Sequence, residues 1–189
     1  MHWGFLMWDL GNFLAIDTET YLIGEGRVAP KVVSVQLCDD RREPWVITNS
    51  EDVVGKIKSL INTKILVGAN IAFDMGALCH SYPELQESIW RAYTENRVLC
   101  CMVLEKLIHI SHGWEGKDPR SGAMLSASLA AMVRVYLGDK MEGKEGEDVW
   151  RFRYRELDGV PLSEWPDDAL SYAANDALYT WDVFCLLYT

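Results

Sequence analysis

Short runs of apolar and β-branched residues near the start of the chain predict three β-strands. The runs are FLAID at 13–17, VVSVQLC at 32–38 and PWVIT at 44–48. Glycine, proline and charged residues separate these runs, as is typical of strands that are joined by turns. We therefore expect a three-stranded meander at the beginning of the fold.

The pattern then changes to the spacing of a helix. Ser50 belongs to a residue type that caps helix N-termini, and apolar residues follow it at helical intervals. These residues are Val53, Val54, Ile57 and Leu60. The next apolar run, KILVG at 64–68, predicts a buried strand. The expected order is strand, strand, strand, helix, strand.

Helical patterns dominate the rest of the chain. They cover residues 72–81, 97–110, 125–137 and 166–187. Two intervening segments, 111–123 and 138–165, are rich in glycine and charge, so we expect long loops there. Strands that come first and helices that follow indicate an α/β fold. A chain of 189 residues, 49% of them apolar, can bury the core of a single domain spanning 1–189.

Cysteine usage and net charge narrow the class of protein. Five cysteines without paired spacing suit free thiols in a reducing compartment, so we expect an intracellular, cytoplasmic protein. The opening segment lacks a signal-peptide pattern, and no segment is apolar for long enough to span a membrane. A net charge of −10 argues against broad electrostatic attraction to DNA or RNA.

Two carboxylates mark the end of the first predicted strand. Asp17 and Glu19 are two residues apart, so both side chains point to one face and can share a cation. Acids that are simply solvated at the end of a strand show the same pattern. Taken alone, this pair favours the simpler explanation.

Two further groups of polar residues follow in predicted helices. Asn70 comes directly after a buried strand, where it can cap the helix that contains Asp74. Tyr172 and Asp176 are four residues apart and so share one face of the last helix. Ordinary capping and an exposed helix face explain each group when it is taken singly. Together with the first pair, in this order, they form a recognisable constellation.

The motifs IDTET, NIAFD and YAAND resemble the three exonuclease motifs of the DEDD superfamily, in the subclass with tyrosine in the third motif. This subclass includes the proofreading domains of family A DNA polymerases and the ribonuclease D group. SASLAAMVRVYLG at 126–138 resembles the helix that precedes the third motif, and KEGEDVW at 144–150 resembles a stretch after that helix. Two features depart from the pattern: residues 151–165 form a longer link, and Ala69 stands where relatives often have histidine.

The resemblance implies the ribonuclease H-like fold of DnaQ-like exonucleases, with a central mixed β-sheet flanked by helices. It also implies a 3′-5′ exonuclease domain, which we expect to have been excised from a longer DNA polymerase. The last residues, CLLYT, stop within an apolar helical pattern and favour that expectation.

Two Mg²⁺ or Mn²⁺ ions are the expected cofactors, because phosphodiester hydrolysis suits two metals and carboxylates suit hard cations. The resemblance implies that Asp17 bridges both ions, that Glu19 and Asp176 complete the first site, and that Asp74 holds the second through water. It also implies that Tyr172 orients the attacking water. The sequence contains no cluster of cysteine and histidine residues, which argues against a zinc site. The expected surface or loop histidines are His80, His109 and His112.

The resemblance implies that the terminal nucleotide contacts Thr18, Asn70 and, less directly indicated, Phe73, for which a place in the core is the alternative. RFRYR at 151–155 is the most basic short run, and its aromatic residues suit a single strand. A solvated link is the alternative for that run, and both stay open here.

The first hypothesis for the partner is the 3′ end of single-stranded DNA, with a polymerase domain or polymerase partner that supplies a basic duplex groove. A ribonuclease D-like exoribonuclease is the second hypothesis, because the catalytic acids do not separate DNA from RNA. The third is a catalytically silent nucleic-acid-binding domain, which the intact acids disfavour.

Overall fold

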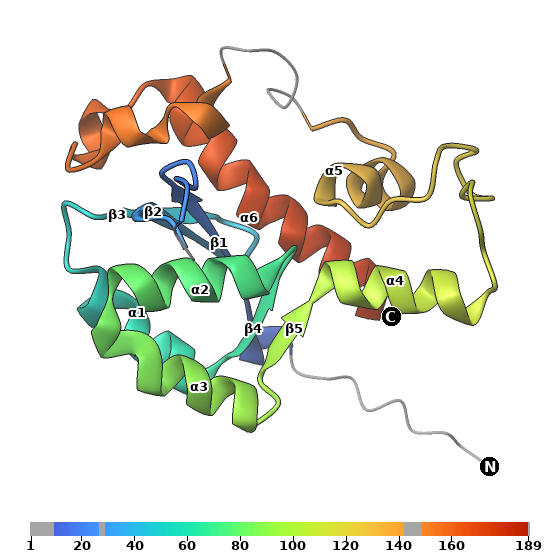
Figure 1. Ribbon diagram of the computed structural model, residues 1–189, viewed down its shortest axis with the longest axis horizontal. Coiled ribbons are helices and arrows are strands. Elements are labelled where there is room, and N and C mark those ends of the chain that lie inside the picture. Colours follow the sequence, from blue (N-terminus) through green and yellow to red (C-terminus); the bar gives the residue numbers. More distant parts are fainter. Residues whose placement is uncertain (1–9, 27–28, 142–148, 189) are drawn as a thin grey trace.

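The computed structural model describes residues 10–26, 29–141 and 149–188, and it contains a five-stranded mixed sheet in the order β3-β2-β1-β4-β5 (Figure 1). Apolar, β-branched residues fill the strands, which are buried on both faces at the centre of the sheet. The strands are β1 (Phe13–Thr20), β2 (Val32–Cys38), β3 (Trp45–Thr48), β4 (Ile65–Gly68) and β5 (Val98–Cys100).

The C-terminal part of β1 has a strand partner on one side only. β1 pairs with β2 antiparallel and with β4 parallel, and the β4 pairing involves only Phe13 to Ala15. The remaining residues of β1 therefore extend beyond the end of β4. β2 pairs antiparallel with β3, and β4 pairs parallel with β5. The predicted meander and mixed sheet are confirmed.

Helices cover both faces of this sheet (Figure 1). They are α1 (Val53–Thr63), α2 (Ile71–Ser81), α3 (Gln86–Thr94), α4 (Cys101–Ser111), α5 (Leu129–Met132) and α6 (Asp167–Tyr188). Leu14 and Ile16 of β1 pack with α1, α2 and α3, whereas Phe13 and Ala15 pack with α6 and its neighbours. Alternation along β1 thus sends successive side chains to opposite layers.

A third apolar cluster joins the segment before α6 to β2 and β3. Its buried members include Tyr154, Leu157 and Trp165, and the Tyr154 hydroxyl donates a hydrogen bond of 2.8 Å to the Ala169 carbonyl. The segment that was expected to be a long loop therefore contains short 3-10 helices. These are Trp150–Phe152, Tyr154–Leu157 and Leu162–Glu164. Residues 144–148 of the KEGEDVW stretch and the first nine residues lie outside the described part of the chain.

Several predicted boundaries were wrong. Ser50 does not cap α1; the Asp52 side chain accepts the Gly55 N–H instead, while the Ser50 hydroxyl pairs with Thr48. The helix expected from 97 begins at Cys101, because the first apolar residues form β5. Helix α3 was not predicted at all. In the 125–137 segment only α5 and a following π-helix, Val133–Leu137, are helical.

Two expectations about connecting and apolar segments agree with the structure. Residues 112–123 contain no helix or strand and so form the expected loop. Within the described ranges, no helix has the length and apolar character needed to cross a lipid bilayer.

Candidate active site

Alternation along β1 places two carboxylates against α6. Asp17 and Glu19 point to the same side as Phe13 and Ala15, and α6 presents Asp176 there. One carboxylate oxygen from each of the three acids lies within 4.8 Å of the others. Glu19 is only 7% exposed and Asp176 only 9%. Three acids this close repel one another unless a positive charge lies among them.

Thr18 lies between these two acids and points to the opposite layer, where α2 contributes Asp74. β1 extends beyond the end of β4 at this position, so the Thr18 backbone N–H has no hydrogen-bond partner in β4. The Thr18 N–H and hydroxyl both donate to Asp74 Oδ1, at 3.0 and 2.8 Å. Both bonds use one oxygen, so Oδ2 is the atom that Asp74 can offer to a ligand.

Burial acts strongly on the Asp74 carboxyl, which is 4% exposed. It raises the pKa of Asp74 to about 7, against the two hydrogen bonds from Thr18, which lower the pKa. The nearby charge of Asp176 raises it further. A cation at this position would favour the carboxylate form.

Helix α6 also positions Tyr172, one turn before Asp176. Its ring packs against the buried ring of Tyr154, with the ring centroids 6.1 Å apart and the planes tilted by 53°. Burial raises the pKa of Tyr172 above its usual value, the charges of Asp176 and Glu19 add to that rise, and Arg151 opposes it. The phenol therefore stays protonated at neutral pH and can donate a hydrogen bond.

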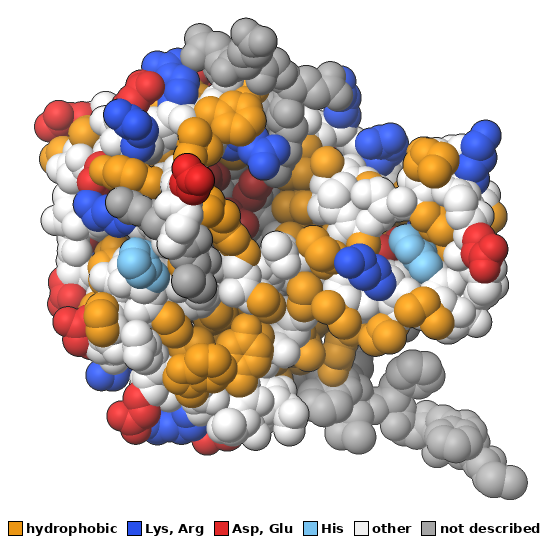
Figure 2. Space-filling view, in the orientation of Figure 1, with side chains coloured by type: hydrophobic (Ala, Val, Ile, Leu, Met, Phe, Trp, Pro, Cys, Tyr) orange, Lys and Arg blue, Asp and Glu red, His pale blue; other side chains and the backbone are white. Residues whose placement is uncertain are grey.

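All of the predicted site residues line a single cavity of about 700 Å³. Figure 2 shows acidic side chains recessed in a hollow on this face, beside hydrophobic side chains. The predicted residues on its wall are Asp17, Thr18, Glu19, Asn70, Phe73, Asp74, Tyr172 and Asp176. Phe73 is 36% exposed, so it is not a core residue. Asn70 is at the N-cap position of α2, but its side chain makes no capping hydrogen bond.

The basic run at 151–155 serves two purposes. Arg151 and Phe152 line the cavity, and Arg151 is the only lysine or arginine among the described residues on its wall. Tyr154, by contrast, is buried beneath Tyr172, and Arg153 pairs with Glu156 at 3.0 Å. The run is therefore neither a solvated link throughout nor a continuous strand-binding surface.

Several residues on the wall were not predicted from the sequence. Leu22 and Ile23 follow β1 and are 56% and 58% exposed, which is unusual for adjacent large aliphatic residues. Their position directly after the first acidic motif is a signal that could have marked them. Met102, Ser128 and Leu129 belong to other elements, and no local pattern pointed to them.

The donor set of the acidic cluster fits hard divalent cations. Carboxylate oxygens are the ligands that Mg²⁺ and Mn²⁺ prefer, and neither cysteine nor histidine belongs to the cluster of Asp17, Glu19 and Asp176. The structure therefore provides a site rich in oxygen ligands, where three carboxylates of the cavity wall lie close together.

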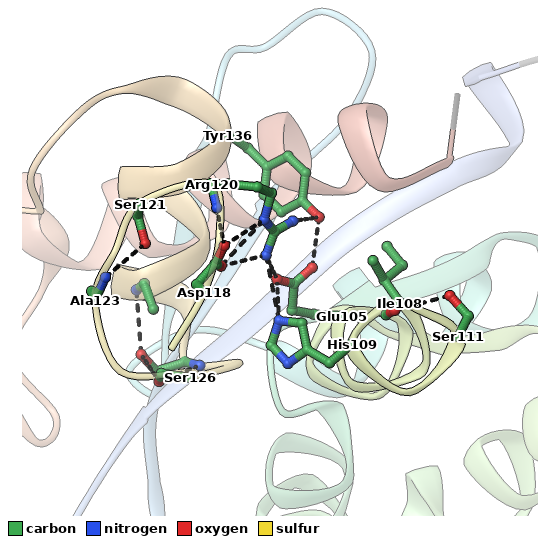
Figure 3. A network of polar contacts seen from close by, with 12 residues as sticks. Glu105, Ile108, His109, Ser111, Asp118, Arg120, Ser121, Ala123, Ser126 and Tyr136 are labelled. Carbon is green, nitrogen blue, oxygen red and sulfur yellow. Dashed lines mark hydrogen bonds and ion pairs between the residues drawn. The ribbon is translucent and has the colours of Figure 1, made fainter. Parts of the chain in front are cut away.

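A second group of close ligand atoms, Glu105, His109 and Asp118, has a different character (Figure 3). The Arg120 guanidinium lies among them, 2.5 Å from Glu105 and 2.6 Å from Asp118, and so provides the positive charge. His109 is 8% exposed and lies in α4, which corrects its prediction as a surface or loop residue. His80 and His112 are exposed, as predicted.

Comparisons with known proteins agree on the family. The chain matches the 3′-5′ exonuclease family over residues 9–188. No curated protein sequence matches the chain at a significant level.

Solved structures with a similar fold come from several organisms. The Aedes aegypti Nibbler EXO domain has a TM-score of 0.64 at 16% identity, covering 93% of this chain and 77% of that one. Brucella melitensis NrnC bound to pGG has a TM-score of 0.62 at 18% identity, covering 95% and 74%. Escherichia coli RNase D, an exoribonuclease, has a TM-score of 0.59 at 17% identity, covering 94% and 39%.

The likeness to these structures shows the ribonuclease H-like fold, and the sequence match extends over nearly the whole chain. Members of this family act with divalent metal ions, which agrees with the acidic cluster between β1 and α6. The chain therefore belongs to the DEDD family of 3′-5′ exonucleases and is a metal-dependent 3′-5′ exonuclease domain.

Proposed function

We propose that the domain removes nucleotides one at a time from the 3′ end of a single DNA strand. The observation that carries this proposal is the convergence of acids from β1, α2 and α6 with Tyr172 on one cavity wall. The cavity also contains an arginine and exposed apolar side chains, which suit the phosphate and base of a terminal nucleotide.

In this proposal the acids of β1 and α6 hold one divalent ion. Asp17, Glu19 and Asp176 would be its ligands, and Asp74 with Asp17 would hold a second ion. Two such ions, when bound, neutralise the scissile phosphate and make water a stronger nucleophile at neutral pH. The Tyr172 phenol, held by Tyr154, donates a hydrogen bond that orients the attacking water.

The remaining cavity residues bind and orient the terminal nucleotide. Asn70 supplies amide donors and acceptors, and Thr18, whose N–H and hydroxyl both donate to Asp74, contributes through its backbone carbonyl as an acceptor. Phe73 and Phe152 offer rings for packing against the sugar or base. Arg151 contributes the positive charge that offsets the phosphate as the strand enters an acidic cavity.

The choice of DNA is supported by the family match, whose model takes its name from the exonuclease of family A DNA polymerases. Net charge bears on the partner and not on the choice between DNA and RNA, because both carry the same phosphate charge. With a net charge of −10 and one basic side chain on the described cavity wall, the domain needs a basic surface elsewhere to capture a duplex. A polymerase domain or polymerase partner would supply that surface.

An exoribonuclease is the second candidate. The solved structures of similar fold include NrnC bound to pGG and Trypanosoma brucei RNase D in complex with RNA U12. Discrimination between DNA and RNA depends on contacts to the 2′-hydroxyl. Polar side chains near the cavity mouth, such as Thr20 and Ser128, are available for such contacts.

Digestion of 5′-labelled single strands tests the proposal. DNA and RNA of one sequence are incubated with Mg²⁺ or Mn²⁺ and resolved at single-nucleotide intervals. We expect ladders that shorten from the 3′ end, with DNA consumed faster than RNA. Faster loss of RNA would favour the exoribonuclease instead.

Two variants control for contamination and for loss of charge. Asp17→Ala removes an acid of the cluster and is expected to abolish both ladders. Asp40→Ala removes an exposed acid from a turn outside the cavity and is expected to retain them. Intact substrates with the wild-type protein, or equal digestion by the two variants, would refute the catalytic assignment.

A further inference from the structure

A second, smaller cavity of about 110 Å³ adjoins the candidate active site. The loop before α5 and the π-helix after it form its wall, with Ser121, Ser126, Ser128 and Arg134 among the lining residues. Ser128 also lines the larger cavity, so the two hollows share a boundary. A strand whose 3′ end occupies the larger cavity would therefore have the smaller cavity as a neighbour on the Ser128 side.

The serine hydroxyls of this second cavity have donor capacity to spare. Ser128 Oγ accepts from the Ala131 N–H at 3.3 Å and from the Ser126 hydroxyl at 3.1 Å. Ser121 Oγ accepts from the Ala123 N–H at 3.4 Å. These bonds use the oxygen atoms as acceptors, so the Ser121 and Ser128 hydrogens remain available to a ligand with acceptor atoms.

Arg134 adds a positive charge that has no partner among the described residues. It is exposed, and the described part of the chain contains no hydrogen bond or ion pair to its guanidinium. The carboxylate in this cavity, Asp118, is already neutralised, because Arg120 contacts its two oxygens at 3.0 and 2.6 Å. Among the described lining residues, the uncompensated charge is therefore positive.

The loop that carries these serines is held in place by a buried carboxylate (Figure 3). Glu105 on α4 is 1% exposed and accepts hydrogen bonds from Arg120 at 2.5 Å and from the Tyr136 hydroxyl at 2.6 Å. Arg120 in turn bonds Asp118, so one network ties α4, the loop and the π-helix together. The loop that carries Ser121 is thus held in place before any ligand arrives.

We propose that this cavity binds a backbone phosphate of the substrate strand, on the 5′ side of the bond that is cleaved. Hydroxyls and an arginine are typical phosphate contacts, and an anion satisfies donors that a cation would leave unpaired. The site rests on the proposed function, since it takes its ligand from the strand held in the larger cavity. It gives strands longer than the terminal nucleotides a contact that a dinucleotide does not reach.

The dependence of cleavage on strand length tests this inference. The kcat/KM values for a hexanucleotide and a dinucleotide are measured for the wild type and for Arg134→Gln. We expect the hexanucleotide-to-dinucleotide ratio to fall roughly tenfold in the variant, as one charged hydrogen-bond contact is lost. The slope of log affinity against log salt should also fall by about 0.7 for the hexanucleotide.

Lys58→Gln is the matched control, because it removes one exposed positive charge from α1, on the other face of the sheet. It should keep the wild-type ratio. Ser121→Asp is a second probe, since it places a negative charge in the small cavity and should lower the ratio as well.

The outcomes separate this inference from the proposed function. If the wild type cleaves neither oligonucleotide, the proposed function fails. If the wild type cleaves both, a folded Arg134→Gln variant with the wild-type ratio and salt slope overturns the phosphate site alone. Circular dichroism establishes folding, and if Arg134→Gln does not fold, Ser121→Asp decides the question by the same criterion.

Discussion

Thr18 donates two hydrogen bonds to a single oxygen of Asp74, one from its backbone and one from its hydroxyl, at 3.0 and 2.8 Å. This contact joins β1 to α2 at the point where β1 has extended past β4. The neighbours of Thr18 on the strand, Asp17 and Glu19, face α6 instead. One strand segment therefore positions acids in both layers of the fold.

Thr18→Val should weaken catalysis without displacing the strand. The substitution keeps the backbone bond and the side-chain shape but removes the hydroxyl donor. Asp74 is then held by one hydrogen bond instead of two, so its carboxylate is less firmly oriented. We expect kcat to fall about tenfold, which corresponds to about 1.4 kcal/mol in transition-state free energy. Thr18→Ser retains the hydroxyl and should stay within about twofold to threefold of the wild type. Equal rates for Thr18→Val and the wild type would contradict a role for this bond.

Divalent ions should stabilise the domain through the acidic cluster. A ligand at one hundred times its dissociation constant stabilises the folded state by about 2.7 kcal/mol. For a domain of this size, that corresponds to a rise in Tm of roughly 5–10 °C. We expect such a rise when Mg²⁺ or Mn²⁺ is added to protein that was treated with EDTA, measured by thermal unfolding.

Asp176→Asn is the informative variant for that experiment. It removes one of three mutually repelling carboxylates, so the metal-free variant should be at least as stable as the metal-free wild type. It should nevertheless lose most of the Tm rise on addition of the metal. Asp40→Asn, an exposed acid in a turn, should keep the full rise. A full rise in Asp176→Asn would remove that residue from the ligand set.

Four of the five strands could be predicted because each is a continuous apolar run, whereas β5 and α3 were not predicted. β5 is three residues long and continues directly into α4, so its apolar residues merge with the helical period. Helix α3, QESIWRAYT, buries only Ser88, Ile89 and Ala92 and exposes Trp90. Leu85, Ile89 and Ala92 are nevertheless all buried and stand at helical spacing, so this stripe is a signal that could have marked the helix.

The acids of the candidate site could be predicted from the order of the three motifs and their resemblance to the DEDD exonucleases, but the partners of these acids could not. Alternation shows that Thr18 points away from Asp17 and Glu19, yet no local pattern tells which helix lies there. Arg151 and Tyr154 belong to one basic run, and only the packing of Tyr154 beneath Tyr172 separates their roles. Long-range packing supplies the information that local periodicity lacks.

Glu105→Gln should destabilise the domain in a pH-dependent way. Burial acts to raise the pKa of Glu105, but hydrogen bonds from Arg120, Tyr136 and His109 outweigh it and hold the pKa below its usual value. A carboxyl whose pKa is lower in the folded state stabilises that state above its unfolded pKa, about 4.3, and loses this contribution as the pH falls. We expect a cost of about 1–3 kcal/mol at pH 7.

Urea unfolding at a series of pH values measures this effect. The difference in unfolding free energy between the wild type and Glu105→Gln should be largest near pH 7 and should shrink below pH 4.3 or so. Glu87→Gln removes a carboxylate that is 88% exposed on α3 and should show no such pH-dependent difference. A difference that is constant from pH 3 to pH 7 would show that the charge of Glu105 does not stabilise the fold.

Tyr172→Phe separates water orientation from metal binding. The Tyr172 ring packs against the Tyr154 ring, and phenylalanine retains that ring. The substituted side chain should therefore keep its position while the hydroxyl donor is lost. We expect kcat to fall roughly ten- to hundredfold, as the attacking water is no longer held in line. The Mg²⁺-induced rise in Tm should remain, because the acids are unchanged.

The pH–rate profile adds a second criterion for the same residue. Burial raises the pKa of Tyr172 above its usual value of about 10, so the wild-type phenol should remain a donor up to pH 9 and cause no loss of rate there. Tyr93→Phe, on α3 at the other face of the sheet, serves as the matched control and should retain the wild-type kcat. A Tyr172→Phe variant with an unchanged kcat would exclude the phenol from catalysis. Loss of the Mg²⁺-induced Tm rise would instead indicate that the hydroxyl supports the metal site, because a hydrogen bond to water alone cannot account for that loss.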